Sequence, residues 1–406
     1  MTWAFRGSRW SVVVGAALAA GLAGTYQYGW SVIRGPLGET TGAPGTTLGT
    51  LFTLLVVAQT LTGFPAGWVR DRRGPRLPFL CSALLLAAGF AGVALAPTFP
   101  ALYLWFALGG AGVGVAYDVA INTPSRWFAG RRGMVTGAVS MGFSATSFLL
   151  IPLIGRGVET AFTPTLLVLA VLAGGGSLLA ARVVRDPTGS REGPSSGSGG
   201  STDDRPVRAP DDGTSAAVTW RSMVRDPRFW LLYVLFAVVN GVGLMLIEKV
   251  VAYAGRLGLS PTAAVAAASL VALGQASGVL VVGTVSDRVG RERVLGGSLA
   301  LCGLALVACV VAGSRGFEWA FVACAGVTMF FRSPSFSVLS VLVGEYYGER
   351  YSSENYAVLL TAKLWGGVFG GTLTSLLVLS LGWSSTFLFT AALASATGVV
   401  ALFSLR

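Results

Sequence analysis

The sequence of 406 residues contains no histidine, and only Lys249 and Lys363 among its 29 basic residues are lysines. Without histidine the chain lacks the usual near-neutral proton carrier, so a proton would ride on a carboxylate or a lysine. The hydrolase pattern HExxH and the phosphate-binding pattern GxxxxGK are also absent. No nucleophile and base stand at a spacing that would pair them. We therefore expect no enzyme activity, no metal and no cofactor.

Charged residues are also scarce, at 12% of the chain against 53% hydrophobic residues. Such a composition cannot give one soluble core with a wet surface, so we expect a membrane protein. The formal charge of +11 does not indicate a nucleic-acid partner, because the arginines lie at the ends of apolar runs. The four cysteines lie inside apolar runs and are expected to be small buried hydrophobes: Cys81, Cys302, Cys309 and Cys324.

Apolar runs account for most of the chain. They lie near 11–33, 46–69, 77–96, 100–122, 134–155, 163–183, 229–250, 263–285, 294–312, 317–341, 356–380 and 383–404. Each is close to the roughly 20 residues with which a helix crosses ~30 Å of hydrocarbon. Helices satisfy their own backbone groups where lipid offers no partner. The fold class expected is an all-α membrane protein with twelve transmembrane helices.

Arginine is distributed unevenly between the two sets of loops. If the N-terminus is cytoplasmic, the inner segments hold most arginines and the opposite loops hold few, as the positive-inside bias requires. We expect a multi-pass protein of the cell membrane with both termini cytoplasmic. Arg6, Arg9 and the apolar stretch from Val12 would also suit a cleaved signal peptide. Cleavage would leave eleven spans and break the pairing of two halves described next.

A polar motif occurs twice, each time directly after an apolar run. GWVRDRRGPR and GTVSDRVGRER share the pattern GxxxDRxG at a constant shift of 216, which is 283 minus 67. The repeated residues are Gly67, Asp71, Arg72 and Gly74, and then Gly283, Asp287, Arg288 and Gly290. A duplicated hairpin between membrane helices points to a two-bundle transporter whose repeats rock around a central site. We expect these hairpins to act in gating; the alternative is that they only anchor a loop at the headgroups.

The duplication divides the chain. We expect a first six-helix bundle at 1–185, a cytoplasmic linker at 186–226 and a second six-helix bundle at 227–406. The linker contains REGPSSGSGGSTDDRP, whose glycine, serine, proline and charge cannot bury enough surface to order the segment. It is therefore expected to be largely disordered.

Both GxxxDRxG copies resemble the loop motif of the major facilitator superfamily. The resemblance implies two six-helix bundles around a cavity at the membrane midplane, and we expect a monomer. GEYYGERYSSENYAVLLTAKLWGGVFGG from Gly344 is similar to the oxalate/formate antiporter and monocarboxylate transporter group. GTYQYGWSV around Tyr28, AYDVAINTPSRWFAGRRGMVTG from Ala116 and FWLLYVLFAVVNGVGLMLI from Phe229 are similar to it as well. That group implies secondary active transport of small organic anions by alternating access.

Lys363, within the sequence TAK, matches the substrate-binding lysine of that group. A cation inside a membrane helix is costly unless it faces a cavity or a partner, and an anionic substrate supplies a reason for it. The alternative is a lysine held by a neighbouring carboxylate. From the helical rise, Arg332 lies nearly level with Lys363, either as a second substrate contact or as a helix-pairing residue. Further candidates for the substrate site are Tyr28, Tyr117, Trp365 and Asn240.

Val279 stands where that group commonly carries an arginine, and the polar residue Gln275 lies one helical turn before it. The resemblance therefore favours monocarboxylates such as formate, lactate or pyruvate over oxalate. Asp118 and Glu248 are the candidates for coupling protons to transport, with Glu248 alternatively an interfacial partner of Lys249. Proton symport and anion exchange both stay open.

Two other functions share this fold. A drug-efflux proton antiporter would carry the same loops, but GAVSMGFSATSFLLIPLIG from Gly137 lacks the Gly-Pro pair usual for that class. A non-transporting membrane sensor would bind its ligand through the same residues and show no flux.

Overall fold

The computed structural model describes residues 8–96, 98–128, 132–187, 218–333, 335–348 and 351–405, and within these ranges it is helical with no strand. The first seven helices are α1 (Arg9–Tyr28), α2 (Trp30–Thr41), α3 (Gly45–Arg73), α4 (Arg76–Leu95), α5 (Phe99–Ser125), α6 (Arg132–Thr160) and α7 (Phe162–Val183). The later elements are α8 (Trp220–Met223), α9 (Pro227–Arg256), α10 (Pro261–Val289), α11 (Arg291–Ser314), α12 (Glu318–Arg332), α13 (Ser335–Tyr347), α14 (Ser352–Leu360), α15 (Ala362–Val368), the π-helix η4 (Phe369–Leu373), α16 (Thr374–Leu381) and α17 (Trp383–Ser404).

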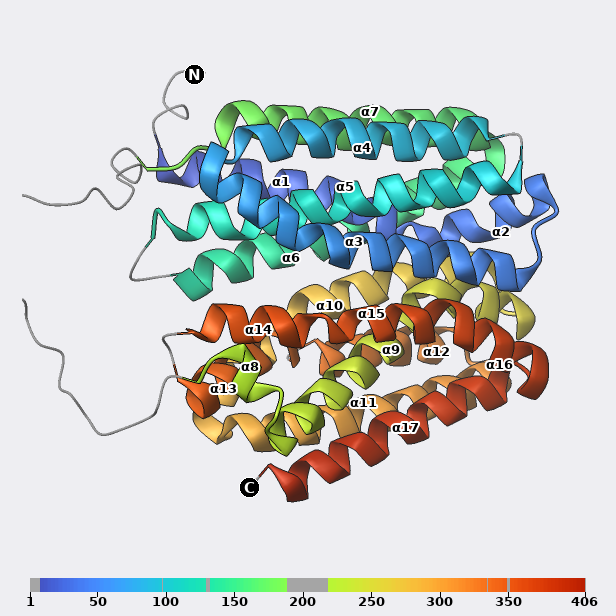
Figure 1. Ribbon diagram of the computed structural model, residues 1–406. Coiled ribbons are helices and arrows are strands. Elements are labelled where there is room, and N and C mark those ends of the chain that lie inside the picture. Colours follow the sequence, from blue (N-terminus) through green and yellow to red (C-terminus); the bar gives the residue numbers. More distant parts are fainter. Residues whose placement is uncertain are drawn as a thin grey trace, which may run out of the picture.

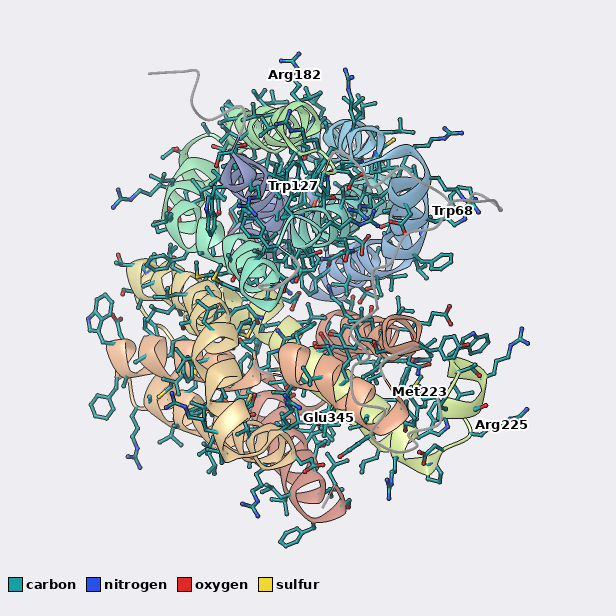
Figure 2. All side chains as sticks on the ribbon, turned by 90° about the vertical axis from the view of Figure 1, so that its left-hand side faces the viewer. Trp68, Trp127, Arg182, Met223, Arg225 and Glu345 are labelled. Atoms are coloured by element: carbon teal, nitrogen blue, oxygen red, sulfur yellow. The ribbon has the colours of Figure 1, made fainter. Side chains whose placement is uncertain are left out.

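The helices form two bundles that lie side by side with their long axes roughly aligned (Figure 1). Helices α1–α7 make the first half, and α9–α17 make the second half. Helix α1 begins and α17 ends at the same end of the bundles, which we call the termini side; α3 begins and α9 ends at the opposite side. Seen from the termini side, Trp68 and Trp127 mark the first half, and Met223 and Glu345 mark the second (Figure 2).

Ten helical segments of the described chain are long and apolar enough to cross a membrane. Two more crossings each consist of two helices. One is made of α1 and α2, which meet at Gly29, and the other of α12, which ends at Arg332, and α13, which begins at Ser335. Counting each interrupted crossing once gives twelve, in the twelve ranges predicted from the apolar runs. The expected all-α, twelve-helix membrane fold is confirmed.

Two of the crossings are irregular near their middle. Helix α12 ends at Arg332, two residues before a proline in the sequence. In the crossing from α14 to α16, the π-helix η4 follows Gly366 and Gly367 and contains Gly370 and Gly371. Single π-turns inside α-helices occur frequently at functional sites.

Small residues set the close approach of helices within each half. Gly110 and Gly114 of α5 lie against the backbone of Leu55 and Gln59 in α3. In lipid, where no hydrophobic drive joins helices, such small residues permit close packing. Helix α1, which cleavage of a signal peptide would remove, packs against α5, α6 and α7.

The predicted linker lies mostly outside the described residues, which resume at 218. There the backbone N–H of Val218 donates to the Tyr347 carbonyl at 3.0 Å, and Asn355 Nδ2 donates to the Val218 carbonyl at 2.9 Å. Asp226 then caps α9 by accepting from the Arg228 N–H at 2.9 Å. The chain therefore enters the second half along a fixed path that includes α8, a helix the sequence did not predict. The domain bounds at 185 and 227 stay predictions.

Replacing Gly110 with valine should lower the thermal midpoint of the detergent-solubilised protein by several degrees. Overpacking a filled contact costs ~1–3 kcal/mol, and the new side chain would meet the Leu55 backbone, which cannot rotate away. The matched control is Gly175→Val in α7, because a Cβ there meets nothing within 4 Å. Equal midpoints for the two variants, measured by fluorescence-detected size exclusion after heating, would contradict this packing.

Candidate functional site

Arg332, the last residue of α12, lies buried between the helices of the second half. Its Nε donates to the Val239 carbonyl at 3.1 Å, and its two terminal nitrogens donate to Gln275 Oε1 at 2.7 Å and Asn240 Oδ1 at 3.0 Å. Its guanidinium also lies 5.0 Å from the centre of the Phe336 ring. All of these partners are neutral, so they orient the cation without cancelling its charge.

Lys363, on α15, is the second cation of this region. It interacts electrostatically with Arg332, so two positive charges repel each other near the middle of the crossings. Among the described residues no acceptor lies within hydrogen-bonding distance of its ammonium, and no carboxylate pairs with either cation. The alternative of a lysine held by a neighbouring carboxylate thus finds no partner in the described ranges.

Two tyrosines of the first half lie within electrostatic range of Arg332. Tyr28 of α1 and Tyr117 of α5 both interact electrostatically with Arg332 and with one another. Their rings pack on Phe143 of α6, at centroid distances of 5.7 and 4.7 Å. The Tyr117 hydroxyl also donates to Ser140 Oγ at 3.5 Å. Five of the six predicted substrate contacts are thus related through Arg332: Asn240 by a hydrogen bond, and Lys363, Tyr28 and Tyr117 by electrostatic interaction.

Trp365 is the predicted substrate contact that the structure leaves apart. Its indole is 62% exposed, two residues beyond Lys363 on α15, and no contact joins it to the other candidates within the described ranges. Residues two apart on a helix do not share a face, which explains the separation.

Asp118 lies toward the termini side, beside the first GxxxDRxG motif. Its Oδ1 accepts from Asn122 Nδ2 at 3.1 Å, while its buried Oδ2 has no hydrogen-bond partner. A Cβ at Gly67 would lie 3.2 Å from that Oδ2, and the charges that act on Asp118 are those of Arg70 and Asp71. Its described surroundings are therefore the hairpin, and its role in proton coupling stays a prediction.

Glu248, the other coupling candidate, is paired. Its carboxylate accepts from Arg34 Nε of the first half at 2.8 Å and from the neighbouring Lys249 ammonium. The interfacial pair with Lys249 weighed in the sequence is present, and Arg34 extends it across the two halves.

The first hairpin is organised by Arg70, a residue that the motif pattern left out. The Arg70 side chain is 2% exposed and donates to Asp71 at 2.9 Å, Asp186 at 3.1 Å and the hydroxyl of Thr123 at 3.3 Å. Asp71 in turn pairs with Arg126 at 2.6 Å. These contacts join α3, α5 and the chain after α7 within the first half.

The other motif residues lie as follows. Arg72 covers the Trp68 ring, with its guanidinium carbon 3.8 Å from the ring centre. Gly74 and Gly290 end α3 and α10 at φ of 79° and 103°, a backbone region that favours glycine. Gly283 and Asp287 lie in α10, and the Arg288 side chain is exposed. A gating role for both motifs stays a prediction.

Sequence reasoning also missed Tyr356 of α14. Its hydroxyl donates to the Phe336 carbonyl at 3.0 Å, and it interacts electrostatically with Tyr117. The available signal was its spacing of seven residues from Lys363, which puts both on one helical face. The described residues contain no cluster of three or more cysteine or carboxylate side chains that could hold a metal ion.

Comparison with known proteins gives a consistent set of relatives. A sequence model of the Major Facilitator Superfamily matches residues 15–254 and 243–406. The chain is 29% identical over 390 residues to the oxalate:formate antiporter of Oxalobacter formigenes, covering 95% of this chain and 88% of that protein. It is 25% identical over 368 residues to the uncharacterized MFS-type transporter YhjX of Escherichia coli K12, covering 87% and 85%.

Two solved structures have similar architecture. The nucleoside transporter NupG superposes with a TM-score of 0.73 at 12% identity, covering 97% of this chain and all of that one. A bacterial homologue of the lysosomal transporter Spinster, in an inward-facing and unoccupied conformation, superposes with a TM-score of 0.67 at 17% identity, covering 99% and 95%. At these identities the likeness concerns the fold alone.

Arg70→Gln should destabilise the protein by about 3 kcal/mol, since it leaves Asp186 unpaired and removes charge-assisted hydrogen bonds. Arg72→Gln removes the same charge but only an exposed stacking contact worth ~0.5–1 kcal/mol. Thermal midpoints of the two purified variants measure the difference. An Arg72→Gln midpoint as low as that of Arg70→Gln would contradict the assignment of Arg70 as the organising residue.

Proposed function

Because the chain belongs to the Major Facilitator Superfamily, a family of membrane transporters, we propose that it carries small organic anions across the membrane by alternating access. Lys363 and Arg332 hold the carboxylate of the substrate, and the hydroxyls of Tyr28 and Tyr117 approach it from the first half. The one observation that carries this proposal is a pair of cations with no carboxylate partner in the described chain: Arg332, buried against three neutral acceptors, and Lys363, partly buried and without an acceptor.

The energetic reason is the cost of unneutralised charge. A buried ion is tolerated when an opposite charge or a dense set of hydrogen bonds replaces its lost water. Arg332 has three neutral acceptors, and Lys363 has none in the described chain. A bound carboxylate supplies the missing negative charge and accepts from both side chains.

The substrates proposed are formate, lactate, pyruvate and oxalate. A relative that matches 95% of the chain is an oxalate:formate antiporter by name, which supports small carboxylates as the class. Position 279 is valine here, and Arg332 contacts Gln275, one helical turn before it on α10. A second fixed cation beside α10 offers a partner for the second carboxylate of oxalate, so dianions are included.

Exchange suits this site better than net uptake. When the substrate leaves, Lys363 and Arg332 keep their positive charges, and in the described ranges neither cation has a carboxylate partner that could replace it. An empty carrier would have to change conformation with two unneutralised buried cations, which slows its return. A second anion that enters removes this barrier.

Orientation follows from the arginine distribution. We place the termini side in the cytoplasm and the protein in the cell membrane, because the segments on that side carry most of the arginine. The two bundles rock about the central cations, as expected of carriers built from repeats.

Lys363→Gln should lower exchange of labelled formate or oxalate by about 10- to 100-fold, because it removes a charged donor worth ~1.5–3 kcal/mol. Lys363→Arg keeps the charge and should retain measurable exchange. Initial rates of counterflow in proteoliposomes measure both, with lactate and pyruvate as further substrates. The control is Arg256→Gln, an exposed arginine at the opposite side.

Carboxylate flux that survives Lys363→Gln unchanged would remove Lys363 from the site. Flux of a lipophilic cation in place of the carboxylates would favour the drug-efflux alternative. Carboxylate binding to the parent without any flux would favour a sensor.

A further inference from the structure

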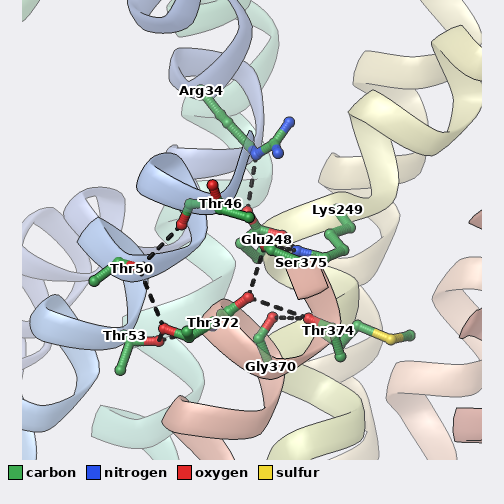
Figure 3. Close-up of polar contacts among 12 residues, drawn as sticks. Arg34, Thr46, Thr50, Thr53, Glu248, Lys249, Gly370, Thr372, Thr374 and Ser375 are labelled. Carbon is green, nitrogen blue, oxygen red and sulfur yellow. Dashed lines mark hydrogen bonds and ion pairs between the residues drawn. The ribbon is translucent and has the colours of Figure 1, made fainter. Parts of the chain in front are cut away.

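Three charged side chains meet between the two halves toward the opposite side (Figure 3). Arg34 of α2 donates through Nε to Glu248 Oε1 of α9 at 2.8 Å. Lys249 pairs with the other oxygen of Glu248 and donates to Ser375 Oγ of α16 at 2.9 Å. We call Arg34, Glu248 and Lys249 the Arg34 cluster.

The Arg34 cluster is buried and carries a surplus of positive charge. Glu248 and Lys249 are 0% and 1% exposed, and Arg34 is 11% exposed. One carboxylate faces two cations, so the cluster has a net charge of +1. Because Lys249 adjoins Glu248 on the same helix, the surplus charge is carried by Arg34 whenever the halves separate.

Arg34 also has unused donors. Only its Nε contacts Glu248, and within the described chain no acceptor lies within hydrogen-bonding distance of its two terminal nitrogens. A guanidinium can offer such nitrogens to a carboxylate in a planar, bidentate contact. The residue therefore combines a positive charge, slight exposure and free donors on the first half.

Next to the Arg34 cluster, and drawn beneath it in Figure 3, hydroxyl contacts join the two halves. Thr53 Oγ1 of α3 donates to the Gly367 carbonyl at 3.1 Å and lies 2.9 Å from Thr372 Oγ1. The backbone N–H of Thr372, in the π-helix η4, donates back to Thr53 Oγ1 at 3.0 Å. The opposite side is therefore closed over the central cations, and its opening must separate Arg34 from Glu248.

We propose that Arg34 is a second carboxylate-binding residue, placed at the opposite-side mouth of the transport path. An arriving carboxylate binds the terminal nitrogens of Arg34 and replaces Glu248 as its partner when the halves part. Glu248 then stays with Lys249 as a neutral pair on α9. This inference rests on the proposed transport of organic anions and adds a site distinct from Lys363 and Arg332.

The crossing that bears Lys363 also reaches this cluster. Lys363 lies on α15, and Ser375, which accepts from Lys249, lies on α16 beyond η4. A shift of this crossing on substrate binding would move the Lys249 partner and the Thr372 contact together. One crossing, with the π-helix η4 in its middle, thus carries Lys363 and also contacts Lys249 of the Arg34 cluster through Ser375.

Two substitutions that break the Arg34–Glu248 ion pair distinguish carboxylate binding by Arg34 from a purely structural role. Arg34→Gln should raise KM for the anion about tenfold from the opposite side, because it removes a charged donor. Glu248→Gln should lower that KM, because it removes the competing carboxylate. If Arg34 served only to hold the halves together, both variants would change KM in the same direction.

The transport assay uses intact cells and inside-out vesicles, which present the two sides in turn. KM from the termini side should rise in both variants alike, because both weaken the contact that keeps the opposite side closed. Arg156→Gln, an exposed arginine of the first half, controls for lost charge. Should Glu248→Gln fail to fold, the double variant Glu248→Gln with Lys249→Met removes the buried cation too. It should show the same decrease in KM.

Closure is measured independently of transport. Thr50 and Thr372 have their hydroxyls 3.5 Å apart across the halves, so a Thr50→Cys, Thr372→Cys pair reports contact by its disulfide yield. The four native cysteines are first replaced by alanine. The yield should fall in both Arg34→Gln and Glu248→Gln, and added formate or oxalate should lower it in the parent pair.

The outcomes separate the two proposals. Normal KM from the opposite side in Arg34→Gln, with exchange still dependent on Lys363, overturns the second site and leaves the proposed function intact. Absence of any carboxylate flux in the parent overturns the proposed function and this inference with it.

Discussion

The structure depends on two positive charges that its own described residues do not neutralise. Arg332 is fixed by the Val239 carbonyl, Gln275 and Asn240, and Lys363 repels it from the neighbouring crossing. In a membrane such an arrangement is costly, and it is explained when the missing charge belongs to the solute. In the proposed function, the transported anion supplies that charge.

The irregular points of the helices lie around these charges. Helix α1 ends beside Tyr28, α12 ends at Arg332, and η4 begins soon after Lys363. Each interruption frees backbone groups and allows a local change of helix direction, which two rocking bundles require. Toward the opposite side, the Arg34–Glu248 ion pair joins the two halves. In both proposals a substrate carboxylate pairs with a cation that lacks a dedicated partner of its own.

Apolar run length was enough to predict the fold, because lipid forces each crossing into a helix. Lys363 and Arg332 could be singled out as candidates from the sequence because a cation in an apolar run demands a partner. The sequence could not show which face of a helix a residue occupies in three dimensions, so it did not reveal that Trp365 is exposed and lies apart from the other candidates, or that Arg70 is buried. The reach of Arg34 to Glu248, over 214 positions, has no local signal.

The most direct test of the unneutralised cations is the thermal midpoint of the purified protein as anion is added. Binding to the folded state alone raises the midpoint with ligand concentration. Formate or oxalate should raise it for the parent and much less for Arg332→Gln, with chloride at equal ionic strength as the reference. A midpoint that responds equally to chloride and to the carboxylates, or a rise that Arg332→Gln preserves in full, would contradict the account.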